Sequence, residues 1–401
     1  MKLHQSGLRF FLIFFSLFLI TSCSQSHDVA VVGGSDNNEK MLNTIEIFDP
    51  TTNMFSLVPT TMSTGRMTAT ATLLTNDTVL ITGGQGSGTL NSAEIYQPLH
   101  NTITLTIGTM NHVRVAHTAT LLDPAVVSGS LAGQVLIAGG DAFSSQGTAE
   151  LFNPSTNTFI NTGNMEVPRR QHTATLISHC GCSADGLVLI TGGYDNQFNV
   201  LMSAELYNPT TKTFTPVGNM TSPRFRHTAT LLNDGTILIA GGASQMSAKT
   251  GDINPALNTA EIFDPKTKKF TATKGVMSAY REAHAASLLQ DGTVLITGGQ
   301  DNHFLIQNNA EIYHPSTGVF TPTASSCAGA PPPKGCMTSG RDFHISQTLD
   351  DGRVLIAGGV NSQFVTIATA ELYDPATKTF TQTGNMSTAR NGAAACLILR
   401  G

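Results

Sequence analysis

Short apolar runs, separated by glycine, proline and polar residues, fill most of the chain. One run recurs as VLITGG or a close variant, and each copy is followed by a variable stretch and then by AEIY or a relative of it. A further run, HTATLL, alternates threonine with small apolar residues. Apolar runs of about four to eight residues between turn residues predict β-strands. Because no long segment shows the helical period of about 3.6 residues, the pattern predicts an all-β protein.

These runs form a repeat that occurs seven times and is marked by a pair of glycines. The first glycines of the pairs are Gly33, Gly83, Gly139, Gly192, Gly241, Gly298 and Gly358. Successive pairs lie 49 to 60 residues apart, a spacing that accommodates a group of short strands and their turns. Each repeat therefore predicts one small antiparallel sheet.

Two charged residues hold fixed places in every repeat. The glutamates of the AEIY run are Glu46, Glu94, Glu150, Glu205, Glu261, Glu311 and Glu371. The arginines before the HTATLL run are Arg66, Arg114, Arg169, Arg224, Arg281, Arg341 and Arg390. Because both slots fall near one rim of the predicted domain, we expect a girdle of Arg–Glu pairs that holds the loops in place.

The glycine pair, the strand pattern and the period near 50 residues resemble the kelch-repeat and galactose-oxidase-like β-propeller family over residues 29–401. The resemblance implies one all-β domain, a propeller of seven blades with four strands each. In the kelch order HTATLL is the innermost strand, VLITGG the second and AEIY the third. The outermost strand has Phe or Ile in place of the family's usual Trp, and the chain contains no Trp.

The two ends of the chain complement each other in this scheme. The first repeat begins with a second strand, VAVVGG, whereas the last repeat ends on an inner strand at residues 393–399. We therefore expect the C-terminal inner strand to join the N-terminal blade and close the ring. Closure removes the edge strands that an open propeller would expose.

The N-terminus has the pattern of an export signal at residues 1–22. Lys2 and Arg9 provide positive charge before an apolar run at residues 10–20. This run is too short to span a bilayer. The sequence LITSC resembles a bacterial lipobox, so we expect Cys23 to carry lipid and residues 23–28 to form a tether. Ser24 favours the outer membrane, on its periplasmic or surface side. The alternative is a soluble secreted protein with an ordinary cleavage site.

Charge argues against a nucleic-acid partner. Only 12% of the residues are charged, and the formal net charge is −5, or −7 without Lys2 and Arg9. No cluster of basic residues is present that would attract a phosphate backbone.

Strand alternation divides the loops between two rims. The outward rim, as we call it, carries the loops between second and third strands and the loops that enter each inner strand. The remaining loops lie on the opposite rim. Because the tether enters a second strand from the opposite rim, we expect that rim to face the membrane. The outward rim has a long insertion at residues 243–258 and is the rim on which kelch proteins commonly bind partners.

Candidate ligand-binding residues lie on the outward rim, where the repeats differ. They are Arg170, Tyr194, Arg226, Tyr280, Glu282 and Asp342. The charged members lie between the Arg slot and the inner strand, where they could grip a polar ligand or form a solvated, mutually paired rim. Phe198, Phe304 and Phe364 each follow a glycine pair by five residues, and we expect them to pack within their loops.

A histidine opens the inner strand in five repeats. These residues are His117, His172, His227, His284 and His344. A ring of histidines near a channel suggests a metal site or a proton relay. However, a metal needs convergent ligands rather than a circumferential series, and Ala69 and Ala393 replace the histidine in the other repeats. We expect a structural role for the histidines, with no metal or other cofactor.

The remaining cysteines predict disulfide chemistry, which export permits. Cys327 and Cys336 flank a short loop and are expected to pair. Cys180 and Cys182 form a disulfide, stay reduced, or bind metal with His179; the spacing leaves these alternatives open. Cys396 lies in the closing strand and is expected to be buried.

No enzyme motif is complete in this chain. The copper site of galactose oxidase includes a stacking Trp, which is absent here, and no HExxH motif or zinc-type spacing of Cys and His occurs. The sequence favours a non-catalytic binding or scaffold protein that acts as a single chain on an envelope or surface protein. The alternative is a carbohydrate-binding or carbohydrate-active propeller, such as a sialic acid mutarotase or another sugar epimerase, with a glycan as its ligand.

Overall fold

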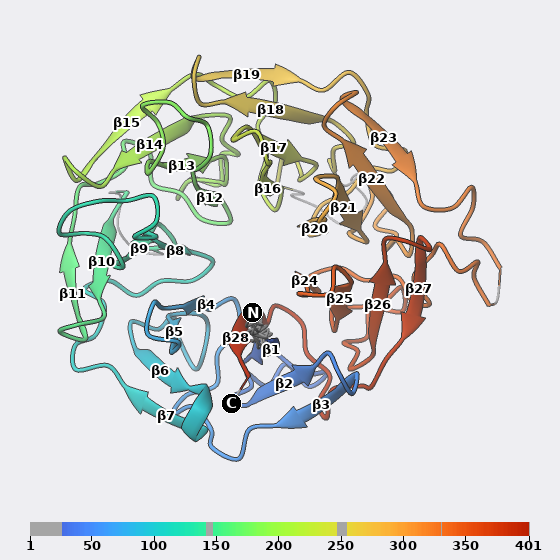
Figure 1. Ribbon diagram of the computed structural model, residues 1–401, viewed down its shortest axis with the longest axis horizontal. Helices are drawn as coiled ribbons and strands as arrows, with labels where there is room; N and C mark the ends of the chain where they lie inside the picture. Colours follow the sequence, from blue (N-terminus) through green and yellow to red (C-terminus); the bar gives the residue numbers. More distant parts are fainter. Residues whose placement is uncertain (1–25, 142–146, 247–254, 330, 401) are drawn as a thin grey trace, which may run out of the picture.

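The computed structural model describes residues 26–141, 147–246, 255–329 and 331–400. These residues form seven four-stranded sheets, which are arranged as blades around a central axis (Figure 1). Neighbouring strands within each sheet are antiparallel. The seven-bladed propeller predicted from the repeats is therefore confirmed.

The strands of each blade run in sequence from the axis outward, except in the first blade. That blade contains β28 (Ala394–Leu399), β1 (His27–Val32), β2 (Ile45–Asp49) and β3 (Met54–Leu57). The second contains β4 (Thr70–Leu73), β5 (Val79–Thr82), β6 (Ala93–Gln97) and β7 (Thr102–Leu105), with a short 3-10 helix η1 (Pro98–His100) before β7. The third contains β8 (Thr118–Leu121), β9 (Val135–Ala138), β10 (Ala149–Asn153) and β11 (Thr158–Asn161).

The remaining blades repeat this order. The fourth contains β12 (Thr173–Leu176), β13 (Val188–Thr191), β14 (Ala204–Asn208) and β15 (Thr213–Val217). The fifth contains β16 (Thr228–Leu231), β17 (Ile237–Ala240), β18 (Ala260–Asp264) and β19 (Lys269–Ala272). The sixth contains β20 (Ala285–Leu288), β21 (Val294–Thr297), β22 (Ala310–His314) and β23 (Val319–Pro322). The seventh contains β24 (Ile345–Thr348), β25 (Val354–Ala357), β26 (Ala370–Asp374) and β27 (Thr379–Gln382).

The ring is closed by the two ends of the chain. Strand β28 pairs antiparallel with β1, from His27 opposite Leu399 to Val32 opposite Ala394. Figure 1 shows β28 at the axis beside β1, where it completes the first blade. The closure predicted from the end patterns is confirmed, although β1 begins at His27 rather than at Val29.

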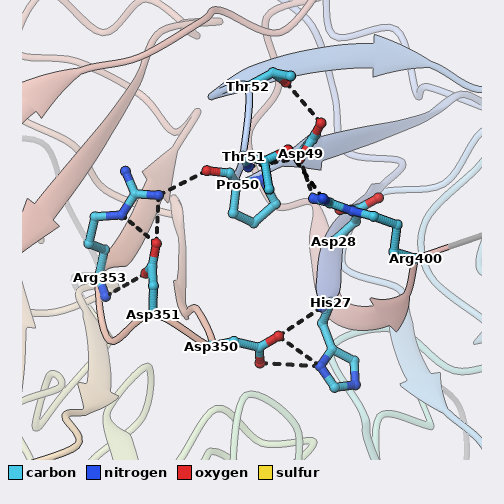
Figure 2. Close-up of polar contacts among 10 residues, drawn as sticks. All are labelled: His27, Asp28, Asp49, Pro50, Thr51, Thr52, Asp350, Asp351, Arg353 and Arg400. Atoms are coloured by element: carbon cyan, nitrogen blue, oxygen red, sulfur yellow. Dashed lines mark hydrogen bonds and ion pairs between the residues drawn. The ribbon is translucent and has the colours of Figure 1, made fainter. Parts of the chain in front are cut away.

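Polar contacts on the opposite rim reinforce this closure (Figure 2). The Arg400 guanidinium, at the C-terminal end, donates to the carboxylates of Asp28 and Asp49 in the first blade. The backbone N–H of His27 donates to Asp350 in the loop of the seventh blade, at 2.8 Å. The two ends of the chain are thus tied to each other and to the neighbouring blade.

The hydrophobic core lies between neighbouring blades. All four residues of β21 are buried, which explains the continuous apolar runs of the second strands. On one side Leu295 packs with Val354 of the seventh blade, and on the other Val294 packs with Leu238 of the fifth. Each sheet is therefore stabilised by its neighbours.

An aromatic pair replaces the family's outer-strand Trp. In the fourth blade Phe214 lies directly opposite Tyr207 of the third strand, with ring centroids 4.8 Å apart. The first, third, fifth, sixth and seventh blades have an aromatic pair with closely similar geometry. In the second blade Ile103 lies opposite Tyr96 instead. Cross-strand aromatic pairs of this kind stabilise antiparallel sheets.

Candidate functional site

The outward rim is built on seven buried ion pairs between the Arg and Glu slots. The pairs are Arg66–Glu94, Arg114–Glu150, Arg169–Glu205, Arg224–Glu261, Arg281–Glu311, Arg341–Glu371 and Arg390–Glu46, with Nη2 to Oε1 distances of 2.6–2.8 Å. In the fifth blade Arg224 also donates to the carbonyl of Gly241, and Glu261 accepts the backbone N–H of Thr221. Each pair thus fixes both loops of its own blade, as the girdle interpretation requires.

The same arginines join neighbouring blades through their backbone. The carbonyl of Arg224 accepts the N–H of Gly193, the second glycine of the preceding blade, at 2.9 Å. Gly192 has a φ of +60°, and a Cβ there would lie 2.3 Å from that carbonyl oxygen. Glycine is therefore required at this position because any side chain would collide with the next blade.

A closed circle of backbone hydrogen bonds surrounds the mouth of the channel. Its members are Thr68, Ala116, Gln171, Arg226, Ala283, Phe343 and Gly392, which have φ values of +48° to +58°. The N–H of each residue donates to the carbonyl of its counterpart in the preceding blade, at 2.9–3.4 Å. The circle closes where Thr68 donates to Gly392. The sequence does not predict this circle, because six of its seven members are not glycine, the residue type that most often has a positive φ.

The histidine ring has the structural role that the sequence favours. Both Thr173 and Thr191 in the fourth blade lie 3.1 Å from Nε2 of His227 in the fifth, through their Oγ1 atoms. Burial lowers the pKa of His117, His284 and His344 to about 3. Burial also holds the pKa of His172 and His227 well below the usual value. The imidazoles are therefore neutral links between blades at physiological pH.

A cavity of about 300 Å³ opens at the channel mouth on the outward rim. Its wall includes the histidines and several members of the hydrogen-bonded circle, among them Gln171, Arg226, Ala283 and Phe343. Ala283 stands between Arg226 and Phe343 in the circle. This cavity is the centre of the candidate site.

Arg226 is held rigidly over the cavity. Its Nε donates to Oε1 of Gln171 at 3.0 Å, and its Nη1 lies 3.6 Å from Oε2 of Glu282. The guanidinium carbon is 4.9 Å from the ring centroid of Phe343 and 5.3 Å from that of Phe225. A guanidinium fixed by stacking and by a hydrogen bond loses little freedom when it binds a ligand.

Asp342 is a buried acid beside this arginine. It is 6% exposed, and within the described residues its Oδ1 has no hydrogen-bond partner. Burial raises its pKa to about 7; the positive charge of Arg226 opposes this shift, and the negative charge of Glu282 adds to it. The structure therefore brings Arg226, Glu282 and Asp342 together, and both acids are buried.

Arg170 and Tyr194 form a second group that leads away from the cavity. The guanidinium carbon of Arg170 lies 5.6 Å from the Tyr194 ring centroid. The Tyr194 ring stacks on Phe198 at 6.0 Å and meets the edge of Phe225 at 5.7 Å. An aromatic series thus runs from an exposed loop to the ring beside Arg226. Tyr280 is 42% exposed and lies outside both groups.

The loop phenylalanines differ from expectation. Phe198, Phe304 and Phe364 are 62%, 37% and 66% exposed. Although Phe198 stacks on Tyr194, the prediction that all three pack within their loops is wrong. These side chains are part of the outward surface.

The described cysteines are not among the residues that line the cavity. The structure joins Cys327 to Cys336 and Cys180 to Cys182, which selects the disulfide among the alternatives for the second pair. Nδ1 of His179 lies 2.9 Å from the Ser178 hydroxyl. Cys396 is a buried free thiol, as expected. Cys23 lies outside the described residues.

Metal-binding clusters and membrane-spanning helices are both absent from the described residues. Within residues 26–141, 147–246, 255–329 and 331–400, no cluster of three or more His, Cys, Asp or Glu side chains is placed to hold a metal ion. In the same ranges no helix has both the length and the apolar character needed to cross a bilayer.

Comparisons with known proteins agree with this architecture. The Kelch motif model matches residues 177–221. Spermatocyte protein spe-26 of Caenorhabditis elegans is 27% identical over 177 residues, which cover 43% of this chain and 29% of that relative. The chain thus spans less than a third of this curated relative.

Two solved structures share the fold. A fungal alcohol oxidase of the AA5 family, in complex with copper, is 17% identical with a TM-score of 0.59, over 81% of this chain and 66% of that one. YjhT is 14% identical with a TM-score of 0.55, over 80% of this chain and 97% of that one. These neighbours show that the chain shares a propeller fold with them, and the motif match identifies one kelch repeat at residues 177–221.

Proposed function

We propose that this protein is a non-catalytic binding module that uses its outward rim to hold a protein partner. A kelch propeller is a fold suited to protein–protein interaction. The observation that carries the proposal is the contrast between the blades' shared frame and the varied position at their mouth. The Arg–Glu pairs occur in all seven blades, whereas the position in the hydrogen-bonded circle has a different residue in almost every blade.

The rigid display of these divergent residues supports binding. The hydrogen-bonded circle holds the backbone of the mouth in place, and stacking holds Arg226 over the cavity. Arginine and aromatic residues are the types that most often dominate the energetics of protein interfaces. The described ends of the insertion at residues 243–258 pair with each other at Ala243 and Ala256, and residues 247–254 lie outside the described residues.

Co-purification tests this function. A protein partner should be retained by the wild type and lost when residues 243–258 are shortened to the length of the matching loop in the fourth blade. Arg226→Ala and Asp342→Ala should leave the fold intact and lower retention only moderately, because a broad interface spreads its contacts over several loops. Retention by the loop-shortened chain would place the binding surface elsewhere.

A second candidate is a carbohydrate-binding or carbohydrate-active propeller. One observation favours it: burial raises the pKa of Asp342 to about 7 near Arg226, which lines the cavity, and a group that titrates near neutrality suits general acid–base catalysis. A glycan array that includes sialic acids tests this candidate. A specific hit abolished by Asp342→Asn would support it, and mutarotation assays would follow. The histidines do not fit a copper centre, because their Nε2 atoms contact threonine hydroxyls of the neighbouring blades.

We also propose that the module is exported and anchored to the bacterial envelope by lipid on Cys23. The support is the leader pattern at residues 1–22 and the lipobox-like LITSC sequence. The first strand starts at His27 on the opposite rim, so an anchor at Cys23 would leave the outward rim free. Metabolic labelling with palmitate tests the anchor: the wild type should incorporate label and Cys23→Ser should not. Equal labelling of both would contradict it.

A further inference from the structure

Four loops on the outward rim share one turn. In the fourth blade, Oδ1 of Asp195 accepts the backbone N–H groups of Gln197 and Asn199, at 2.9 and 2.8 Å. Asp36, Asp301 and Asn361 accept two N–H groups in the same way. We call these four segments the tip loops: residues 35–41, 194–200, 300–306 and 360–366.

One residue in each tip loop has a positive φ. These residues are Glu39, Phe198, Phe304 and Phe364, with φ values of +57°, +64°, +62° and +57°. A bulky side chain is unfavourable in this conformation, by roughly 1–2 kcal/mol relative to glycine. Three of the four loops nevertheless have phenylalanine there. The rings are 37–66% exposed, and although Phe198 stacks on Tyr194, packing within the chain leaves a large part of each ring uncovered.

The opposite rim shows that the chain does not generally use aromatic residues in such turns. Each blade there has a turn with one positive φ between its third and fourth strands. The residues are Asn53, Asn101, Asn157, Lys212, Lys268, Gly318 and Lys378. On the opposite rim, polar residues and glycine take the positive φ of these turns. In three of the four tip loops of the outward rim, phenylalanine takes it.

The tip loops also have a consistent chemical character. Leu305 and Val365 follow two of the phenylalanines and are 61% and 43% exposed. The charged residues of the tip loops are mostly acidic: Asp36, Glu39, Asp195 and Asp301, against Lys40 alone among Lys and Arg. Acidic loops would repel an anionic lipid surface, whereas they complement a basic one.

We propose that Phe198, Phe304 and Phe364 are anchor residues for a protein partner whose apolar surface is bordered by lysine or arginine. The inference rests on the proposed binding function and names the surface and the partner's chemistry. Residues held in an unfavourable backbone conformation cluster at binding sites. The exposed rings would enter apolar pockets of the partner, and the nearby carboxylates would face its basic residues.

Asparagine substitution separates binding from folding. The triple variant Phe198→Asn, Phe304→Asn, Phe364→Asn should have a Tm equal to or above that of the wild type, because asparagine tolerates a positive φ. Glu39→Asn is the matched control at the fourth tip loop and should also preserve Tm. A clear fall in Tm of the triple variant would show that the rings stabilise the fold, and would overturn the proposal.

Binding is measured with a phage-displayed library of random peptides of ~12 residues selected against the full chain. Selected peptides should combine apolar residues with Lys or Arg, and should bind the triple variant at least ~10-fold more weakly, a loss of about 1.4 kcal/mol. Glu39→Asn should reduce their affinity far less. Failure to select peptides, or equal affinity for wild type and triple variant, would overturn the proposal.

Further arms distinguish the possible failures. Peptides that ignore the triple substitution but are lost in Arg226→Ala would leave the proposed function intact and refute only the anchors. Peptides displaced by substitutions at Lys212 and Lys378 on the opposite rim would contradict both. Co-sedimentation with phosphatidylglycerol vesicles that depends on the phenylalanines would identify a lipid surface instead of a protein.

Discussion

Arg390 and Glu46 are 344 residues apart in the sequence and form a buried ion pair, with Nη2 of the arginine 2.6 Å from Oε1 of the glutamate. Arg390 precedes the closing strand β28, and Glu46 lies in β2 of the same blade. The pair therefore joins the two ends of the chain at the one place where the ring is not continuous. Its six counterparts join residues that are close in sequence, within one repeat.

Removing Glu46 should destabilise the whole propeller. Glu46→Ala leaves the guanidinium of Arg390 buried without its carboxylate, a loss of about 3–5 kcal/mol in the free energy of unfolding. Urea unfolding measures the effect. Asp28→Asn is a suitable control because its ion pair with Arg400 is partly exposed and should contribute less than about 1 kcal/mol. An unchanged midpoint for Glu46→Ala would contradict this role.

Deleting the last twelve residues, 390–401, should have a larger effect. The deletion removes the inner strand of the first blade and exposes an edge of β1, so the ring opens and the chain becomes prone to association. Differential scanning calorimetry should show a lower Tm and a broader transition than in a control that lacks only Gly401. An unchanged Tm would refute closure by β28.

The buried histidines should make stability fall as the pH decreases below about 6.5. In the unfolded chain each imidazole binds a proton near that pH, whereas burial in the folded state lowers the pKa of His284, for example, to about 3. The unfolded state then binds more protons, which lowers the free energy of unfolding by about 1.4 kcal/mol per pH unit for each histidine.

His284→Ala tests this linkage directly. Ala69 and Ala393 occupy the same place in two blades, so the fold accommodates alanine there. The variant should be less stable at pH 7. Between pH 6 and pH 4 its free energy of unfolding should fall less steeply than that of the wild type, because unfolding takes up about one proton fewer. A slope equal to that of the wild type would show that this imidazole is protonated in the folded protein.

Asp342 should make stability depend on pH in the opposite direction to the histidines. Burial raises its pKa to about 7 in the folded state, above the unfolded value near 3.9, so the folded state binds the extra proton between these pH values. Stability is therefore lost as the pH rises, by up to roughly 4 kcal/mol. Asp342→Asn should raise Tm at pH 8 and change it little at pH 4.

Asp350→Asn provides a control of opposite sign for that measurement. Partial burial raises the pKa of Asp350, but hydrogen bonds from the backbone and ring of His27 outweigh it and lower the pKa overall, so this carboxylate stabilises the protein at neutral pH. Its substitution should lower Tm slightly at pH 8. If Asp342→Asn lowered Tm at pH 8 as well, the buried carboxyl would have a stabilising partner instead.

The fold was predictable because seven copies of each slot identify the strands independently of any single copy. The unmatched end patterns around Val29 and Cys396 also predicted closure, since a second strand without an inner one needs a partner. The Arg–Glu pairs followed from the same repetition. In each case a residue's place in the repeat determines its place in space.

The candidate site was predictable only in part. Arg170 and Arg226 look equivalent in the sequence, but they occupy successive positions after the slot arginine. Arg226 has a φ of +51° and lies over the cavity, whereas Arg170 stacks on Tyr194. The exposure of Phe364 was missed for a related reason: position in a repeat does not reveal that a turn directs a bulky ring toward solvent.

The central claim, that the outward rim is the binding surface, is tested most directly by site-specific photocrosslinking in the native host. A photoreactive phenylalanine analogue replaces either Phe364 on the outward rim or Lys378 on the opposite rim, two exposed residues of the seventh blade with positive φ. Irradiation should give a discrete protein adduct from position 364 and none from position 378. An adduct from position 378 alone, or from neither position, would contradict the account.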